Sequence, residues 1–135
     1  MLSGSCACGV VAFEADAPPA PITFCNCRTC RKVSGTAFGA NMSVPRHSFR
    51  WLRGEDRLTS YESSPGKVRR FCEACGSAMT AERPGNPDAA VRIRLGTLNT
   101  PIDNPIYVGH IWRSEAADWF NPKLVVGEWP KAGAE

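Results

Sequence analysis

The residues of this chain best suited to chemistry are its seven cysteines, which fall into three short blocks. Along the chain the blocks read Cys6-x-Cys8, Cys25-x-Cys27-x-x-Cys30 and Cys72-x-x-Cys75. Two cysteines separated by one or two residues on a tight turn can place both sulfurs on one metal ion. Gly9 and Gly76 directly follow two of the blocks, and glycine adopts the backbone conformation that such a turn needs. The spacing therefore predicts metal ligation, and two such pairs make a closed, tetrahedral four-cysteine zinc site.

The spacing leaves two partitions of the seven cysteines open. In one, Cys27 and Cys30 join Cys72 and Cys75 in a ribbon-like site, and the other three cysteines have no metal. In the other, which we prefer, the first and last blocks close one four-cysteine site and the middle block stays together. The second partition leaves no cysteine unused and lets one short loop supply three ligands.

The middle block, Cys25, Cys27 and Cys30, is predicted to form a catalytic zinc site. Three protein ligands with an open fourth position are typical of catalytic zinc, whereas structural zinc has four protein ligands. The open position can take water or an incoming thiol. The alternative is a second structural site, in which His110 supplies the fourth ligand.

The elements that must position these cysteines are predicted to be short strands joined by turns, because proline (11) and glycine (12) recur throughout and no segment has helical periodicity. The clearest strand, 91–98, points Val91, Ile93 and Leu95 inward and Arg92 and Arg94 outward. Residues 17–24 are expected to form an extended connector, and a helical turn is expected after Thr29. The other predicted strands are residues 9–14, 37–44, 49–53, 58–62, 67–71, 77–82 and 106–112. This pattern predicts an all-β domain.

The composition limits the class of protein to which the chain can belong. Its 135 residues are the length of one domain, 1–135, which can bury about two thirds of its unfolded surface. The formal charge of +3 would fall to zero with seven thiolates on two zinc ions, so no nucleic-acid partner is expected. No apolar run is long enough to span a membrane, and the N-terminus has no signal-peptide pattern. Cysteines at metal-binding spacing favour the reducing cytoplasm, and the alternative is three disulfides with one free thiol.

The segments around the three blocks resemble those of a known family. They read GSCACGVVAFE, CNCRTCRKVSGTAF, FRWLRGEDRLTSYESSPGKVRRFCEACGSAM, and HIW followed by WF. They are similar to the glutathione-dependent formaldehyde-activating enzyme family, which also includes centromere protein V. The resemblance runs over residues 4–120. The three cysteine blocks in this order, each with its glycine context, are specific together, whereas any one of them alone is a weak signal.

The resemblance implies a zinc-containing, all-β, Mss4-like fold of several short coiled antiparallel sheets with little helix. It also implies two zinc ions per chain, a structural one on the first and last blocks and a catalytic one on the middle block. The zinc ligands would be Cys6, Cys8, Cys72 and Cys75 for the first ion, and Cys25, Cys27 and Cys30 for the second. The type enzyme joins glutathione and formaldehyde into S-hydroxymethylglutathione and is a carbon–sulfur lyase. By this resemblance, the chain is expected to add glutathione or a similar thiol reversibly to a small aldehyde.

One residue departs from the family pattern, which has histidine where this sequence has Asn26. The departure bears on the substrate rather than on the metal sites. Arg28 and Arg31 flank the middle block, and we predict that they offset the charge of the sulfurs and bind the carboxylates of glutathione. The alternative to an enzyme is a non-catalytic, zinc-stabilised binding module. A water or external thiol as fourth zinc ligand would indicate the enzyme, and a protein side chain would indicate the module.

Overall fold

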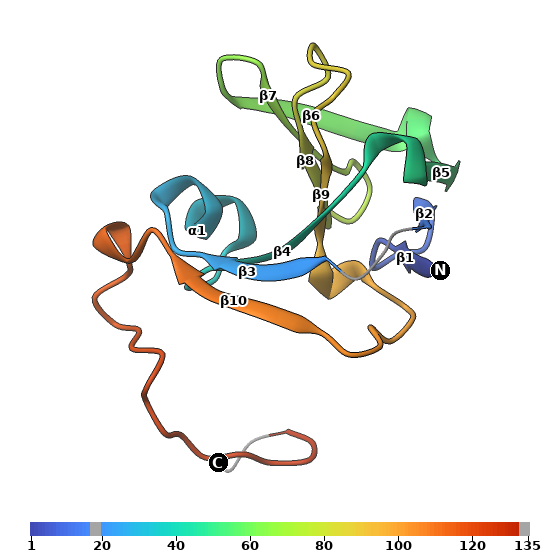
Figure 1. Cartoon of the computed structure of the whole chain (residues 1–135). Coiled ribbons are helices and arrows are strands. Elements are labelled where there is room, and N and C mark those ends of the chain that lie inside the picture. Colours follow the sequence, from blue (N-terminus) through green and yellow to red (C-terminus); the bar gives the residue numbers. More distant parts are fainter. Residues whose placement is uncertain (17–19, 133–135) are drawn as a thin grey trace.

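The structure, a computed structural model, describes residues 1–16 and 20–132. Strands dominate it, and they form two sheets (Figure 1). The smaller sheet has the strand order β1-β2-β5, and the larger has the order β10-β3-β4-β9-β8-β7-β6. The strands are β1 (Leu2–Ser5), β2 (Ala12–Ala15), β3 (Pro21–Cys25), β4 (Gly39–Val44), β5 (Phe49–Arg53), β6 (Leu58–Ser64), β7 (Lys67–Cys72), β8 (Ala78–Glu82), β9 (Val91–Arg94) and β10 (Ile106–Ile111). The predicted all-β class is confirmed.

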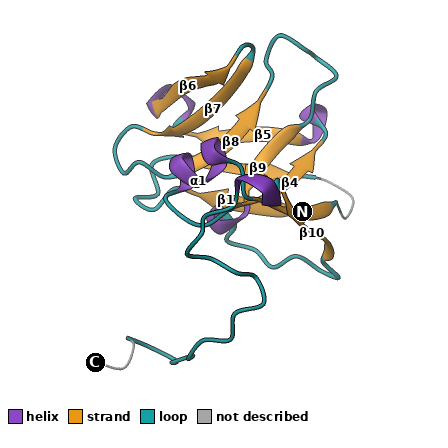
Figure 2. Cartoon of the chain, turned by 90° about the vertical axis from the view of Figure 1, so that its left-hand side faces the viewer, coloured by secondary structure: helices purple, strands orange, loops and turns teal. Residues whose placement is uncertain are grey.

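Within the described residues, helix is limited to one short α-helix and a few single turns at the ends of strands (Figure 2). They are α1 (Arg28–Ser34) and the 3-10 turns η1 (Arg46–Ser48), η2 (Glu55–Arg57), η3 (Leu95–Thr97) and η4 (Arg113–Glu115). The predicted helical turn after Thr29 is part of α1. This helix ends at Gly35, whose φ of 68° allows its backbone N–H to cap the carbonyl of Arg31.

The strand pairs of the described residues are antiparallel except one, in which β10 runs parallel to β3. This pair differs from the expectation of antiparallel sheets. The chain reaches β10 after a long connection from β9, and β10 becomes the edge of the larger sheet. Beyond η4, residues 121–132 extend away from the sheets (Figures 1 and 2).

Several strand boundaries differ from those predicted. The strand 49–53 is confirmed as β5, whereas 91–98 is shortened because η3 begins at Leu95. The extended connector expected over 17–24 is in part β3, a strand between β10 and β4; residues 17–19 lie outside the described part of the chain. Ile22 and Cys25 are buried there, which explains why this segment pairs as a strand. Strand β1 was not predicted, because its residues are small and polar.

The hydrophobic core lies where the smaller sheet meets β4, β8 and β9. Phe13 of β2 is fully buried and stacks on Phe49 of β5, with 5.2 Å between the ring centroids. Met42, Met79 and Ile93 fill the core from the larger sheet. Within residues 1–16 and 20–132, no helix has the length and apolar character needed to cross a membrane.

We predict that Phe13→Ala lowers the free energy of unfolding by about 3–5 kcal/mol, because it leaves a cavity between the two sheets. The matched control is Tyr61→Ala on β6, since Tyr61 is 54% exposed and should change stability by about 0.5 kcal/mol or less. Urea denaturation of the zinc-loaded proteins measures both values. Equal destabilisation by the two substitutions would contradict the placement of the core.

Candidate metal centres

Cys6, Cys8, Cys72 and Cys75 meet in one cluster, the four-cysteine cluster, with all four sulfurs within 4.8 Å of one another. The sulfur of Cys8 lies 3.6 Å from that of Cys6 and 3.9 Å from that of Cys72. Sulfurs placed 2.3 Å from a tetrahedral zinc ion are about 3.8 Å apart, so the donor set and its spacing fit this ion. The cluster contains the four cysteines of the preferred partition and excludes Cys27 and Cys30, which the ribbon-like alternative would have joined to Cys72 and Cys75.

Two tight turns build the four-cysteine cluster. In the turn between β1 and β2, the N–H of Gly9 donates to the carbonyl of Cys6 at 3.1 Å. In the turn between β7 and β8, the N–H of Gly76 donates to the carbonyl of Cys72 at 2.8 Å. The two glycines have φ values of 80° and 78°, which a residue with a side chain rarely adopts. Because one turn belongs to each sheet, the cluster joins the two sheets.

Hydrogen bonds to the sulfurs distribute protons unevenly in the four-cysteine cluster. Hydrogen bonds from the hydroxyl and backbone of Ser77 lower the pKa of Cys75 to about 5. Burial would raise the pKa of Cys6, but the N–H of Val11 and the neighbouring sulfurs lower it. The backbone at Val10 favours ionisation of Cys8, yet the sulfur of Cys6, a loss of hydration and the sulfurs of Cys75 and Cys72 outweigh it and raise the pKa of Cys8 to about 11. Metal binding therefore has to displace the protons that the more basic thiols retain.

Cys25, Cys27 and Cys30 form a second cluster, the three-cysteine cluster, with their sulfurs within 4.8 Å of one another. Cys25 ends β3, Cys27 caps the N-terminus of α1, and Cys30 lies in its first turn. The sulfur of Cys27 accepts a hydrogen bond from the N–H of Cys30 at 3.3 Å. Cys25 and Cys30 are buried and Cys27 is half-buried, so one side of the cluster is open.

Neither histidine nor carboxylate completes the three-cysteine cluster within the described residues. His110 lies close by on β10, but its Nδ1 is 3.1 Å from the side-chain amide nitrogen of Asn26. The alternative in which His110 closes the site is therefore not supported. All seven cysteines are free thiols, which also removes the disulfide alternative.

Asn26 anchors the cysteine loop to β10, a role that the sequence did not reveal. This side chain is fully buried, and its amide nitrogen lies 3.1 Å from the carbonyl of Phe24 and 3.0 Å from that of Ile111. Its oxygen accepts a hydrogen bond from Arg113 at 2.9 Å. Asn26, the residue that departs from the family pattern, thus connects the cysteine loop to Phe24, Ile111 and Arg113 through hydrogen bonds.

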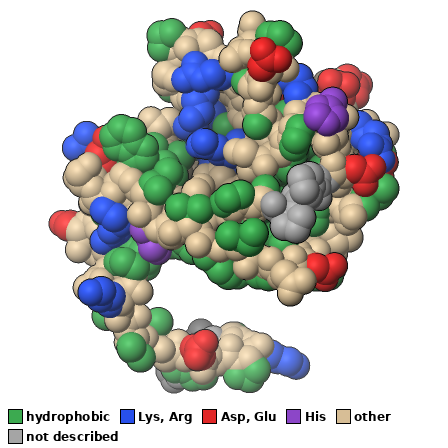
Figure 3. Space-filling view, viewed as in Figure 1, with side chains coloured by type: hydrophobic (Ala, Val, Ile, Leu, Met, Phe, Trp, Pro, Cys, Tyr) green, Lys and Arg blue, Asp and Glu red, His purple; other side chains and the backbone are tan. Residues whose placement is uncertain are grey.

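A cleft of about 410 Å³ opens beside the three-cysteine cluster. Its wall has a positive side, formed by Lys67 and Arg69 of β7 and Arg92 of β9. Opposite them, Trp112 and Glu115 contribute from the segment that follows β10. Lys and Arg side chains gather in one strip on this face of the molecule (Figure 3).

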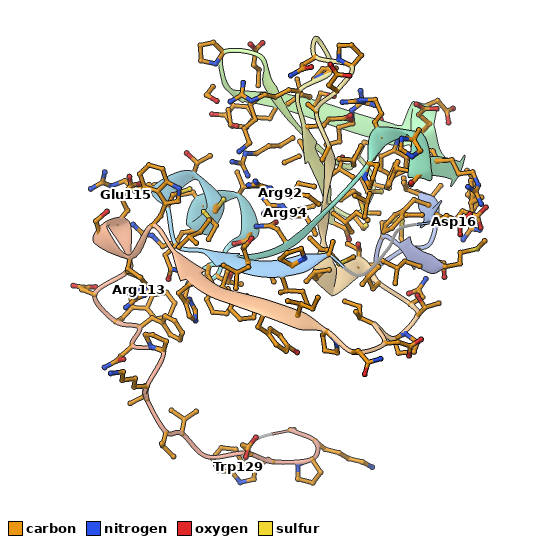
Figure 4. The ribbon with its side chains drawn as sticks, in the orientation of Figure 1. Asp16, Arg92, Arg94, Arg113, Glu115 and Trp129 are labelled. Atoms are coloured by element: carbon orange, nitrogen blue, oxygen red, sulfur yellow. The ribbon has the colours of Figure 1, made fainter. Side chains whose placement is uncertain are left out.

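The positive side of the cleft follows from strand register. Arg69 pairs with Ala81 of β8, and Ala81 pairs with Arg92, so the two arginines flank a small residue across three strands. Lys67 and Arg94 occupy the next positions on the same face, because side chains on one face alternate every second residue. Lys67, Arg69, Arg92 and Arg94 together form what we call the cationic face. Figure 4 shows Arg92 and Arg94 projecting from β9 towards α1.

The arginines singled out from the sequence differ in burial and in their position relative to the cleft. Arg94 points away from the core, as predicted, but it is only 5% exposed, with its Nη1 against Gly39 and bonded to the side-chain oxygen of Asn41. Arg28 and Arg31, the predicted substrate contacts, lie on α1 outside the residues that line the cleft. Adjacency to the cysteines in sequence did not reveal the residues of the cationic face.

The cationic face changes the acidity of the three-cysteine cluster. Burial alone would raise the pKa of Cys30. Hydrogen bonds from the two other cysteines, together with the charges of Arg94 and Arg69, outweigh burial and lower that pKa to about 7. Burial raises the pKa of Cys25 to about 12. The cluster thus holds one thiolate readily and needs a metal ion to ionise fully.

We predict that Cys72→Ser unfolds or aggregates the protein, whereas Cys27→Ser leaves a folded chain with one zinc ion. Cys72 belongs to the cluster that joins the two sheets, and Cys27 belongs to a local loop. A structural zinc contributes about 10 kcal/mol, against a net stability of about 5–15 kcal/mol. Thermal melts and metal analysis of both variants provide the measurement. If both collapse equally, the three-cysteine cluster is also structural.

We predict that Asn26→Ala weakens metal retention at the three-cysteine cluster and lowers stability by about 1–3 kcal/mol, because it leaves buried polar partners unsatisfied. Asn99→Ala is the control, since Asn99 is exposed and bonds only to Ser5 in the side-chain contacts described. Zinc content after dialysis against a chelator, with a thermal melt, measures both effects. Loss of zinc equal to that of the control would contradict the anchoring role.

Comparison with known proteins agrees with this geometry. Residues 1–115 match the family model of the glutathione-dependent formaldehyde-activating enzyme. The chain is 29% identical over 127 residues to the "Putative glutathione-dependent formaldehyde-activating enzyme" of Halomonas elongata, covering 88% of this chain and 79% of that protein. Its fold is similar to the crystal structure of a Rhodobacter sphaeroides protein, with a TM-score of 0.63 and 22% identity over 78% of this chain and 97% of the other. The chain belongs to the glutathione-dependent formaldehyde-activating enzyme family.

Proposed function

We propose that the protein is a zinc-dependent enzyme of the carbon–sulfur lyase type, which reversibly adds a thiol such as glutathione to a small aldehyde such as formaldehyde. The observation that carries this proposal is the three-cysteine cluster beside a cleft with a positively charged wall, to which no histidine or carboxylate of the described residues adds a fourth ligand. The names of the family and of the Halomonas elongata relative supply the two substrates.

Two zinc ions per chain are part of the proposal. Cys6, Cys8, Cys72 and Cys75 would hold a structural ion, since four thiolates saturate a tetrahedral zinc. Cys25, Cys27 and Cys30 would hold the catalytic ion and leave one position for the substrate. Free thiols at every cysteine are consistent with a reducing compartment, and we place the protein in the cytoplasm.

A bound zinc ion would supply ionisation of the substrate thiol and a fixed place for its sulfur. A free thiol with a pKa of about 8.5 is roughly 3% thiolate at pH 7, so full ionisation is worth at most about 30-fold in rate. Holding the sulfur beside the aldehyde carbon can contribute about 7–11 kcal/mol in ideal geometry. The walls of the cleft must therefore provide the larger share of the catalysis.

Lys67 and Arg92 are the groups that we assign to the carboxylates of the thiol substrate. Both line the cleft and are only partly buried, so their charges can reach a bound molecule. Burial and the neighbouring charges of Arg92 and Arg69 lower the pKa of Lys67, and an anion between these cations would relieve their repulsion. Arg28 and Arg31, predicted as contacts, would instead add positive potential at the outer surface of α1.

Glu115 is the group that we assign to proton transfer. The addition forms a sulfur–carbon bond, breaks the carbonyl π bond, and moves the thiol proton to the former carbonyl oxygen. Glu115 lines the cleft, and its carboxylate accepts a hydrogen bond from the backbone N–H of Arg28 at 3.0 Å, which fixes its position. A carboxylate held there can take the proton and return it to the oxygen.

We predict that glutathione enters the shell of the second zinc ion as its fourth sulfur ligand. The average sulfur coordination measured by X-ray absorption at the zinc edge should rise, because an eighth sulfur joins the seven of the protein. Lys67→Met and Arg92→Met should each weaken glutathione binding about tenfold, as expected for a lost charge-assisted hydrogen bond. Their affinity for 2-mercaptoethanol should stay unchanged, since this thiol has no carboxylate. An unchanged sulfur count would contradict the open site.

We predict that the zinc-loaded protein accelerates exchange between formaldehyde hydrate and its glutathione adduct, measured by magnetisation-exchange NMR. Glu115→Gln should slow this exchange about 100-fold or more, because a positioned general base contributes about 10²–10⁴ in rate. The glutamine retains the contact to the Arg28 N–H and serves as a shape-matched variant. If the wild-type protein leaves the exchange rate unchanged, formaldehyde is not the substrate. Unchanged exchange in the variant alone would exclude Glu115 from proton transfer.

A further inference from the structure

Two arginines of the cationic face, Arg69 and Arg94, are buried without an acidic partner. Each is 5% exposed, and within residues 1–16 and 20–132 no carboxylate lies within 4.0 Å of either guanidinium. A buried charge is costly unless it is paired, so unpaired guanidinium groups in the interior are uncommon. Their counter-charge must therefore come from something other than Asp or Glu.

Both guanidinium groups lie close to Cys30. The Nη1 of Arg69 donates to this sulfur at 3.7 Å, while its Nε donates to the hydroxyl of Ser63 at 2.8 Å. The Nη1 of Arg94 and the Cβ of Cys30 both lie against Gly39 of β4, so Arg94 is a neighbour of Cys30 as well. The three-cysteine cluster is thus the anion that these two arginines face.

Arg94 also retains unused donors. Its Nη1 bonds to the side-chain oxygen of Asn41, but its Nε and Nη2 are buried and have no hydrogen-bond partner within the described residues. Buried donors of a charged group without a partner are rare in folded proteins and point to an absent acceptor. Arg94 is not among the residues that line the cleft, where Lys67, Arg92 and Glu115 are found.

The number of buried charges distinguishes between two states of the centre. Zinc with three thiolates and a neutral fourth ligand carries one negative charge, which a single guanidinium would match. Zinc with four thiolates carries two, which match both Arg69 and Arg94. The buried pair therefore corresponds to the state in which the fourth ligand is an anion.

We propose that Arg69 and Arg94 are the positioning residues that make the three-cysteine centre selective for an anionic sulfur ligand over a neutral one. This inference rests on the proposed function and adds the source of its ligand selectivity. The two arginines act through Cys30 and the metal, and they do not contact the aldehyde. They differ in this from Lys67 and Arg92, which we assign to the carboxylates.

The test uses the full chain with cobalt(II) in place of zinc, because cobalt–sulfur absorption bands report on the ligands directly. Dissociation constants are measured for 2-mercaptoethanol, which binds as a thiolate without carboxylates, and for imidazole, which binds as a neutral ligand. Arg69→Met and Arg94→Met should each weaken 2-mercaptoethanol binding about tenfold or more, because a charge close to the anion is lost. Imidazole binding should stay unchanged or become tighter.

Two further variants separate charge from structure. Arg69→Lys keeps the charge and should restore most of the thiol affinity that Arg69→Met loses. Lys123→Met removes an exposed cation beyond η4, outside the residues that line the cleft, and should change neither affinity. Equal loss of both ligands in the Met variants, or failure of Arg69→Lys to restore thiol binding, would show a purely structural role and overturn the inference.

The outcomes for the wild-type protein separate this inference from the proposed function. If the wild-type protein binds no thiol, both are overturned. If it binds thiol and the two Met variants bind it equally well, this inference alone is overturned, and the proposed function stands.

Discussion

Sulfur atoms contributed by two different sheets meet at one point in this protein, and the remainder of the fold depends on that meeting. The turn that carries Cys6 and Cys8 belongs to the smaller sheet, and the turn that carries Cys72 and Cys75 belongs to the larger one. The core between the sheets is modest, and Phe13 is its principal link. A metal–sulfur cluster worth about 10 kcal/mol would then be comparable to the whole net stability of the fold.

The three-cysteine cluster depends on the larger sheet for the cations of β7 and β9 that lie beside it. Along β7 and β9, one face supplies the core with residues such as Ile93, and the other face carries the cations. Alternation of side chains along a strand allows both to occur in the same few residues. Arg69 and Arg94 are each only 5% exposed, so their charges are largely removed from water and act strongly on the sulfurs. The electrostatic effect on the sulfurs therefore depends on the burial of these arginines as well as on their charge.

The parallel pairing of β10 with β3 brings the last part of the fold to the site. It places His110 and Ile111 beside the cysteine loop, where Asn26 bonds to both. The chain then turns at Trp112, whose φ of 58° is rare for a residue with a side chain, and leads to Glu115 on the cleft wall. Strain of this kind persists where the surroundings hold it, and here it lies at the mouth of the cleft.

The sequence by itself determined the all-β class, the strand β5, and the turn chemistry of Gly9 and Gly76. These features depend on local spacing and on the short range of turn geometry, which can be read without knowing what lies opposite. It also favoured the correct partition over the ribbon-like one, because the middle block is contiguous.

The tertiary structure alone decided which cations reach the three-cysteine cluster. Arg28 and Arg31 are its neighbours in sequence, but a helix directs adjacent residues to different faces, and these two lie outside the cleft. Arg69 and Arg92 are far in sequence from the three-cysteine cluster. The register of β7, β8 and β9 brings them to it. Arg94 was predicted to point outward from its alternation with Ile93, which is correct for the sheet. Only the tertiary packing around that face makes the outward-pointing side chain of Arg94 a buried one.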